Sequence, residues 1–226
     1  MKSQKPKKKK REGNFVYDFV KFTGAIPAVL SFRVKKYYIN KNTPKKFKGG
    51  VILAPNHVSF VDPVIVSVVG WYRRLYYLAT MDLFDTKLKS WFFSHIHCIP
   101  VDKQNVSVAS LHAVCDRLKE GKAVVIFPEG KVNRDEEKVE EYKTGAILMA
   151  HISKKPIVPM YIVPGKRWYN RREIVIGEPI DVNALCGPIP TMCELDKACK
   201  ILYEKELELR EFYNDKNKKK GKKEND

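Results

Sequence analysis

Short apolar runs alternate with helix-like segments along most of this chain from Val51 onward. Apolar runs bounded by turn residues predict buried strands, and longer segments with one apolar face predict helices. Strands are predicted at 51–54, 75–79, 98–101, 123–127, 157–163 and 173–177, and helices at 63–70, 83–95, 106–120, 139–153 and 192–212. Such alternation is typical of an α/β fold, so we predict a mixed, largely parallel sheet flanked by helices.

The length of 226 residues, 44% of them hydrophobic, suits one α/β domain with a sizeable core. We place this domain at residues 45–213 and a helical segment at 14–44. The five cysteines are an odd number, with no CxxC pair and no zinc-like spacing to histidine. They are interpreted as reduced thiols in a cytosolic setting, and no metal site is predicted.

Positive charge is concentrated at the two ends of the chain. Of the formal net charge of +17, residues 1–11 carry +7 and residues 216–226 carry +4. Like-charge runs rarely fold, so residues 1–13 and 214–226 are predicted to be disordered basic tails. A basic chain favours an anionic partner, either nucleic acid or an anionic membrane. No nucleic-acid partner is expected, because the excess charge lies in the tails and no RRM, KH or helix-turn-helix signature is present.

The segment at 14–44 is predicted to be an amphipathic, membrane-associated helical element. Phe15, Phe19, Phe22, Ile26 and Val29 recur at helical spacing and give it one apolar face. Its uninterrupted apolar stretch has 11 residues, which suits an interfacial or re-entrant element better than a bilayer span. The alternative is a helix that packs this face on the domain. We expect a peripheral or monotopic protein on the cytoplasmic face of the cell membrane, attracted to anionic lipid.

A histidine and an aspartate follow the first predicted strand, in the stretch "LAPNHVSFVDP". Asp62 precedes Pro63, an arrangement that predicts a helix start with Asp62 as the N-cap. An aspartate held ionised at a helix N-terminus can also bind one ring N–H of His57, so that the other ring nitrogen accepts a proton. Taken alone, the pair is a weak signal of catalysis, because such pairs are common by accident.

A second unusual loop, "FPEGKVNR", follows the predicted strand at 123–127. Gly130 allows a positive φ or a close approach to a ligand, and Glu129 can accept hydrogen bonds from a polyol. Lys131 and Arg134 can bind an anion, with arginine suited to bidentate contact with phosphate. The alternative is a solvated turn. Functional loops leave the carboxyl ends of strands in sheets of this kind, and both loops do so.

Together these stretches resemble the glycerolipid acyltransferases of the lysophosphatidate acyltransferase type. "NHVSFVD" resembles their NHxxxxD box and "FPEGKVNR" their FPEGTRSR box. "CIPVDK", "YKTGA" and "IVPMYI" are similar to further family segments and stand in the family's order. Two departures concern the acceptor: Lys103 stands where arginine is usual, and Lys131, Val132 and Asn133 replace Thr-Arg-Ser.

The resemblance implies an enzyme of phospholipid biosynthesis, a 1-acylglycerol-3-phosphate O-acyltransferase. It would move an acyl group from acyl-CoA or acyl-carrier protein to a lysophospholipid acceptor and give phosphatidic acid, without a cofactor. His57 and Asp62 would be catalytic. The implied substrate-binding residues are Asn56, Lys103, Glu129, Gly130, Lys131 and Arg134.

Three alternatives remain beside this prediction. Within the same chemistry, the acceptor could be glycerol-3-phosphate or another lysolipid. In a different class, the chain could be a non-catalytic protein that binds anionic membranes or nucleic acid.

Overall fold

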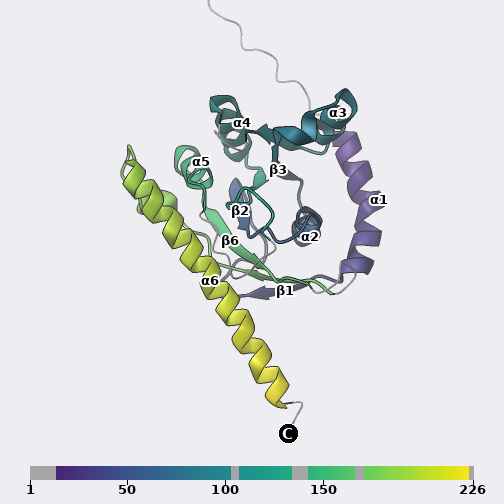
Figure 1. Ribbon diagram of the computed structural model, residues 1–226, viewed down its shortest axis with the longest axis vertical. Helices are drawn as coiled ribbons and strands as arrows, with labels where there is room; N and C mark the ends of the chain where they lie inside the picture. The colour runs from purple at the N-terminus through teal and green to yellow at the C-terminus, as the bar shows by residue number, and fades with distance from the viewer. Residues whose placement is uncertain (1–13, 103–106, 134–141, 166–170, 224–226) are drawn as a thin grey trace, which may run out of the picture.

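The computed structural model describes residues 14–102, 107–133, 142–165 and 171–223, and it contains one seven-stranded sheet with helices on both faces (Figure 1). The strands are β1 (Lys35–Tyr38), β2 (Val51–Pro55), β3 (Leu75–Thr80), β4 (Cys98–Val101), β5 (Ala123–Val125), β6 (Ile157–Ile162) and β7 (Glu173–Ile176). The helices are α1 (Asn14–Phe32), α2 (Asp62–Val69), α3 (Lys87–His95), α4 (Val108–Lys119), α5 (Gly145–Ser153) and α6 (Met192–Lys223), with short 3-10 helices η1 (Met81–Phe84) and η2 (Val182–Ala184).

The sheet order is β1-β7-β6-β2-β5-β3-β4, and only the β6–β7 pair is antiparallel. The predicted mixed, largely parallel sheet flanked by helices is therefore confirmed. Its central strand is β2, whose five residues are all buried. Because β2 lies between β6 and β5, the loops that follow β2 and β5 emerge beside each other at one edge of the sheet.

Strand β1 corrects the predicted helical segment at 14–44. The helix ends at Phe32, and Lys35–Tyr38 pairs with β7 at the edge of the sheet. Tyr37 is buried against residues of β6, β7 and α6. The sequence "KKYY" was missed because it is short and starts with two basic residues. Its four residues form a strand only by pairing with the four residues of β7, which lie far away in the sequence. The sheet thus takes its first strand from residues before the predicted domain boundary at 45.

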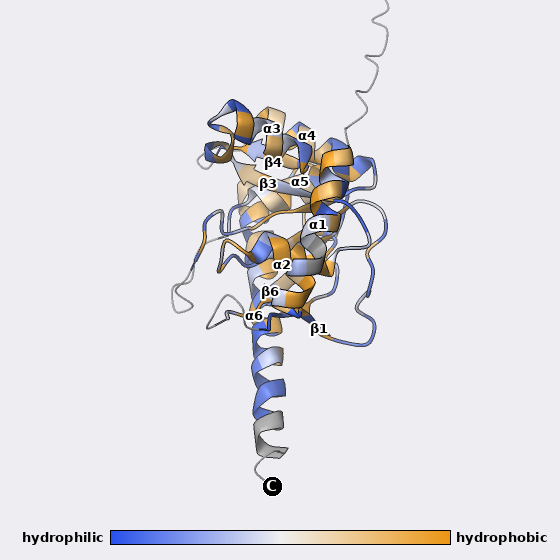
Figure 2. Cartoon of the chain, turned by 90° about the vertical axis from the view of Figure 1, so that its right-hand side faces the viewer, coloured by the Kyte–Doolittle hydropathy of each residue, from blue (hydrophilic) through white to orange (hydrophobic). Residues whose placement is uncertain are grey.

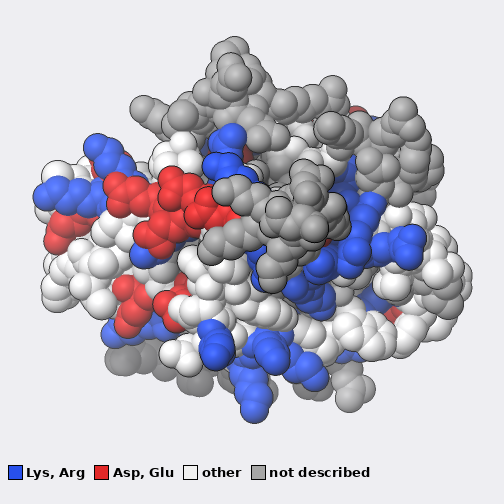
Figure 3. Space-filling view, turned by 90° about the horizontal axis from the view of Figure 1, so that it is seen from below, with Lys and Arg blue, Asp and Glu red and all other residues white. Residues whose placement is uncertain are grey.

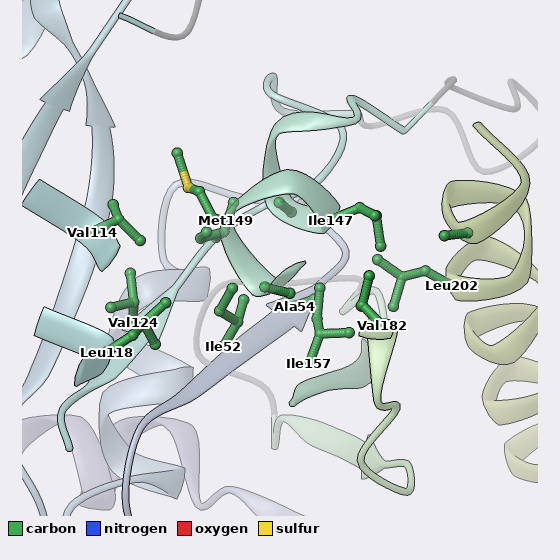
Figure 4. Packing of buried hydrophobic residues seen from close by; sticks show 14 of the residues in the cluster. Ile52, Ala54, Val114, Leu118, Val124, Ile147, Met149, Ile157, Val182 and Leu202 are labelled. Carbon is green, nitrogen blue, oxygen red and sulfur yellow. The ribbon is translucent and has the colours of Figure 1, made fainter. Parts of the chain in front are cut away.

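Side chains along β2 point alternately to the two faces of the sheet, and the core accordingly has two layers. Ile52 and Ala54 pack with α4, α5 and α6, as Figure 4 shows for the labelled side chains of this layer. Val51 and Leu53 point to the opposite face and pack against α2. Successive strand residues point to opposite faces, so a strand that is apolar at every position is covered on both.

Helix α6 runs past the end of the predicted helix at 192–212 and corrects the predicted disordered tail at 214–226. It continues to Lys223, and its distal part projects from the sheet as a hydrophilic rod (Figures 1 and 2). Lysine is a good helix former, and Lys216 lies over the rings of Tyr37 and Phe212, at 4.7 and 5.4 Å from the ring centres. Viewed from this end, basic and acidic side chains gather in separate areas (Figure 3).

Helix α1 lies on the opposite side of the molecule from α6, against α2 and α3 (Figure 1). One face packs on the domain through Tyr17, whose hydroxyl accepts a hydrogen bond from the backbone N–H of Leu75 at 2.8 Å. The other face exposes Phe15, Phe19 and Phe22. These phenylalanines of the predicted apolar face therefore do not pack on the domain, and their contact with a membrane stays a prediction. Among the residues described, no helix is long and apolar enough to cross a bilayer.

Candidate active site

His57 and Asp62 meet in the turn between β2 and α2. The Nδ1 atom of His57 lies 2.9 Å from Oδ2 of Asp62, so the predicted contact between the two side chains is present. The Asp62 side chain is fully buried, whereas the His57 side chain is 16% exposed. The His57 ring also stacks on Phe127, with 4.1 Å between ring centres. Held on two sides, the imidazole keeps Nε2 as the nitrogen that is available to a substrate.

Asp62 does not cap α2, which corrects the prediction that it is the N-cap. It is the first helical residue, the N-cap position is Val61, and no side chain caps the helix there. Instead, Oδ2 of Asp62 accepts hydrogen bonds from the backbone N–H groups of Val58 and Ser59, at 2.8 and 2.7 Å. The carboxylate turns back into the loop because the loop offers it these donors together with the histidine ring. Because all three contacts are made by Oδ2, they fix the orientation of the carboxylate beside His57.

The "FPEGKVNR" loop forms hydrogen bonds with both backbone groups of His57, its N–H and its carbonyl. Oε1 of Glu129 accepts a hydrogen bond from the His57 N–H at 2.9 Å, and the Asn133 N–H donates to the His57 carbonyl at 2.7 Å. Gly130 turns the chain between them with a φ of +69°, a conformation that favours glycine. Glu129, which was predicted to bind substrate, is buried, and its carboxylate supports the backbone of His57.

Asn56 is also a supporting residue rather than the substrate ligand that we predicted. Its side-chain amide donates to the Ile162 carbonyl at 3.1 Å and accepts from the Ile162 N–H at 2.6 Å. Asn56 is buried and does not line the cavity beside His57. The side chain extends the β2–β6 ladder by one residue, so it fixes the position at which His57 leaves the sheet.

Two lysines stand beside Gly130 on the wall of the cavity that contains His57. Lys131 was predicted to bind substrate, whereas Lys143 was not among the predicted site residues. A Cβ atom added at Gly130 would lie 3.1 Å from Nζ of Lys143, which places this ammonium group directly over the glycine. The backbone N–H of Lys143 donates to the carbonyl of Pro128 at 2.9 Å and anchors the pair. Lys103 and Arg134, the two other predicted cations, lie outside the described residues.

The cavity has a volume of about 1830 Å³ and extends from the His57 region to the inner face of α1. Its wall combines the polar group around His57 with apolar side chains of several elements. Among the latter are Val20, Ala28 and Leu30 of α1 and Val64 and Val68 of α2. A space of this kind can take a molecule with a charged head and a long apolar tail.

Cys98 lies on the same wall, and burial raises the pKa of its thiol to about 12. This thiol stays protonated at neutral pH, so it is a poor nucleophile. The groups beside the cavity therefore favour proton transfer by His57 over covalent catalysis by cysteine. The Nε2 atom of His57 has no hydrogen-bond partner among the described residues. A histidine of this kind, with a buried carboxylate behind it and two ammonium groups nearby, can deprotonate the hydroxyl of an anionic substrate.

The fold and the site define an α/β protein whose histidine and aspartate stand where the central strand passes into a helix. A family model described as Acyltransferase matches residues 34–163, more than half of the chain. The chain therefore belongs to the acyltransferase family and is an acyltransferase, as the resemblance implied.

Proteins similar to this chain bear related names. A 1-acyl-sn-glycerol-3-phosphate acyltransferase of Bacillus subtilis is 34% identical over 162 residues, which cover 69% of this chain and 79% of that protein. A probable 1-acyl-sn-glycerol-3-phosphate acyltransferase of Mycoplasma pneumoniae is 33% identical over 140 residues, 58% of this chain and half of that protein. The crystal structure of the lysophosphatidate acyltransferase PlsC of Thermotoga maritima has a TM-score of 0.59 at 18% identity. That match covers 87% of this chain and 79% of the crystallised chain, and it supports the fold.

Proposed function

We propose that this protein transfers an acyl group from a thioester to the free hydroxyl of 1-acylglycerol-3-phosphate, giving phosphatidic acid. The observation that carries the proposal is the 2.9 Å contact of His57 with Asp62 beside a cavity that joins two lysines to an apolar wall. The names of the similar Bacillus and Mycoplasma proteins support the same acceptor.

In this mechanism, Nε2 of His57 removes the proton from the acceptor hydroxyl. The oxygen attacks the thioester carbonyl, the C–S bond breaks, and the imidazolium returns the proton to the departing thiolate. Asp62 holds the Nδ1 proton and stabilises the imidazolium while it exists. No covalent enzyme intermediate forms, and no cofactor takes part. The donor is acyl-CoA or acyl-carrier protein.

The acceptor phosphate is expected near Gly130, where Lys131 and Lys143 supply positive charge. Lysine binds phosphate as a point charge, whereas arginine can form a fork of two hydrogen bonds. The apolar part of the cavity wall suits an acyl chain. Arg134 and Lys103, both outside the described residues, remain predicted phosphate ligands.

We further propose that α1 places the enzyme on an anionic membrane surface, as a peripheral or monotopic protein of the cytoplasmic face. Phe15, Phe19 and Phe22 are 80%, 59% and 65% exposed, and their helix also lines the cavity. A lipid acceptor could then pass from the membrane to His57 along α1. Burial of an apolar helix face in the interface, aided by lysines, is sufficient for reversible binding.

A panel of acceptors tests the reaction. The purified protein is incubated with labelled acyl-CoA or acyl-carrier protein and with 1-acylglycerol-3-phosphate, glycerol-3-phosphate or a lysolipid with a zwitterionic headgroup. We expect the highest kcat/KM with 1-acylglycerol-3-phosphate. Higher values with glycerol-3-phosphate or the zwitterionic lysolipid would reassign the acceptor. No product with any acceptor and either donor would contradict the enzymatic proposal and favour a lipid-binding role.

A further inference from the structure

Large apolar side chains are exposed on α3 and on η1, the short helix that precedes it. Leu88, Trp91 and Phe92 are 75%, 51% and 37% exposed, and Trp91 and Phe92 follow Leu88 by three and four residues, which puts all three on one side of α3. Met81 and Leu83 of η1 are exposed as well. We call these five residues the α3 surface. A helix on a protein surface usually turns its polar side outward, so this arrangement is the reverse of the usual one.

The opposite side of α3 is also apolar. Phe93, and Ile96 just after the helix, line the cavity that contains His57. Phe93 also packs on Phe84 of η1, with 5.9 Å between ring centres. Among the residues that the structure describes, neither η1 nor α3 contributes a buried one. A helix that is apolar on both sides and yet exposed indicates a partner that the described part of the chain does not supply.

The α3 surface continues the exposed apolar face of α1. The two helices are in contact, and α3 lies beside the N-terminal end of α1 (Figure 1). Tyr17 of α1 stacks on His97, two residues after α3, with 4.4 Å between ring centres. Figure 2 looks at this side of the molecule and shows hydrophobic stretches on both helices. Leu83 of η1 and Leu30 of α1 are exposed and also line the cavity, so the cavity opens among these apolar side chains.

The charged residues near the α3 surface balance one another. Lys87 and Lys89 are offset by Asp82 and Asp85, and Nζ of Lys89 lies 3.0 Å from Oδ2 of Asp85. An apolar surface without net charge suits lipid acyl chains better than it suits a charged partner, and tryptophan is typical of the boundary between lipid and water. The proposed acceptor is itself a lipid, so the mouth of the cavity must meet a lipid layer for the acceptor to enter.

We propose that the α3 surface is a second contact with the membrane, which inserts Leu88 and Trp91 among lipid acyl chains and, together with α1, holds the mouth of the cavity against the lipid layer. This inference rests on the proposed function and on the proposed membrane contact of α1. A single interfacial helix leaves a protein free to turn about the helix axis, whereas a second contact beside it fixes the orientation. Apolar insertion does not depend on lipid charge, so this contact forms with uncharged lipids as well.

Flotation with vesicles tests the contact directly. The wild type is compared with Leu88→Ser/Trp91→Ser and with Ile152→Ser/Ile189→Ser, a control that replaces two exposed apolar residues outside the cavity wall. The vesicles contain phosphatidylcholine, with or without phosphatidylglycerol, and thermal melts verify that the variants fold. We expect the α3 variant to bind both kinds of vesicle about tenfold more weakly and the control to match the wild type. Equal binding by the two variants would overturn the proposal.

The fluorescence of Trp91 gives a second measurement that leaves the α3 surface intact. Replacing Trp71 and Trp168 by phenylalanine makes Trp91 the sole tryptophan. Vesicles should then shift its emission to shorter wavelength, and lipids with brominated acyl chains should quench it. Unchanged emission of a protein that floats with the vesicles would contradict the proposal. A shift that grows with protein concentration in the absence of vesicles would assign the surface to a second copy of the chain and would also overturn it.

These measurements use no acyl donor, so they separate this inference from the proposed reaction. Quenching of Trp91 in a protein that forms no product would leave the membrane contact standing while the proposed function fails. Product formation with Trp91 in water would have the opposite meaning. In an active enzyme, Leu88→Ser/Trp91→Ser should raise KM about tenfold for acceptor in vesicles and leave KM for a soluble short-chain acceptor unchanged. An unchanged KM for acceptor in vesicles would count against the α3 surface.

Discussion

The carboxylate of Glu129 accepts a hydrogen bond from the backbone N–H of His57 at 2.9 Å, across 72 residues of sequence. This bond joins the two loops that leave β5 and β2, and it explains why the FPEG segment stands beside the histidine. The turn supports His57 from behind, and its residues Gly130 and Lys131 line the cavity together with Lys143, which comes from further along the chain.

Asp62→Asn should lower kcat by roughly a hundredfold or more, because the neutral amide oxygen that replaces Oδ2 does not stabilise the imidazolium formed on His57 as a carboxylate does. The asparagine oxygen can still accept from the N–H groups of Val58 and Ser59, so the melting temperature should change little. Steady-state kinetics and thermal melts measure the two effects. A variant that retains most of the wild-type kcat would contradict the role of Asp62.

Glu129→Ala should reduce kcat about tenfold to a hundredfold, since the His57 N–H loses its acceptor and the histidine is less well placed. Glu129→Gln keeps an oxygen at that position and should recover much of the loss. Both kcat and the melting temperature should be measured. Equal kinetics for the two variants would show that the hydrogen bond does not matter.

Lys143→Met should raise KM for the acceptor about tenfold and leave kcat within about twofold, because it removes one charge from the phosphate site. Lys143 is exposed, so stability should not change. Lys119→Met, at an exposed position of α4, is the matched control. If KM for the acceptor is the same in both variants, Lys143 does not contact the phosphate.

Replacing both Phe19 and Phe22 by serine should weaken flotation with anionic liposomes by about tenfold or more, since each phenylalanine contributes about 1.5–3 kcal/mol when buried in an apolar phase. Activity on a short-chain, soluble acceptor should remain. Ile189→Ser, which changes another highly exposed apolar residue, serves as the control. Undiminished flotation of the double variant would place the membrane contact elsewhere.

Glu206→Leu should stabilise the protein by about 1 kcal/mol or more at neutral pH, because it removes a buried polar group from the apolar face of α6. The raised pKa of Glu206 determines how the free energy of unfolding depends on pH. Above the ordinary glutamate pKa, Glu206 is ionised in the unfolded chain while it keeps its proton in the folded protein. Wild-type stability therefore falls as pH rises from that value toward the folded-state pKa. Denaturant unfolding at several pH values should show the variant without this loss.

Much of the sheet was predictable because buried parallel strands are continuous apolar runs, as "VILA" in β2 and "IVPMYI" in β6 illustrate. The His57–Asp62 contact was predictable because both residues lie in one short strand-to-helix turn. The cap assignment of Asp62 failed because local helix signals do not reveal that Val58 and Ser59 offer their N–H groups to the same carboxylate.

The residues that were missed depend on contacts between distant segments. Lys143 lies over Gly130 although the two residues are 13 positions apart in the sequence. The feature that could have revealed Lys143 was the family-like "YKTGA" segment, which contains it. Glu206 could have been found as a charged residue among Leu195, Leu202 and Leu209, which share heptad spacing. Glu129, whose negative charge acts on it, however, lies 77 residues earlier in the chain.

The most direct test of the account is the rate of phosphatidic acid formation from 1-acylglycerol-3-phosphate and labelled acyl donor by the His57→Ala variant. His112→Ala, at an exposed position of α4, is the matched control, and circular dichroism verifies that both variants fold. We predict that His57→Ala lowers kcat by at least about a thousandfold while His112→Ala equals the wild type. Wild-type turnover by a folded His57→Ala protein would contradict the assignment of His57 as the catalytic base.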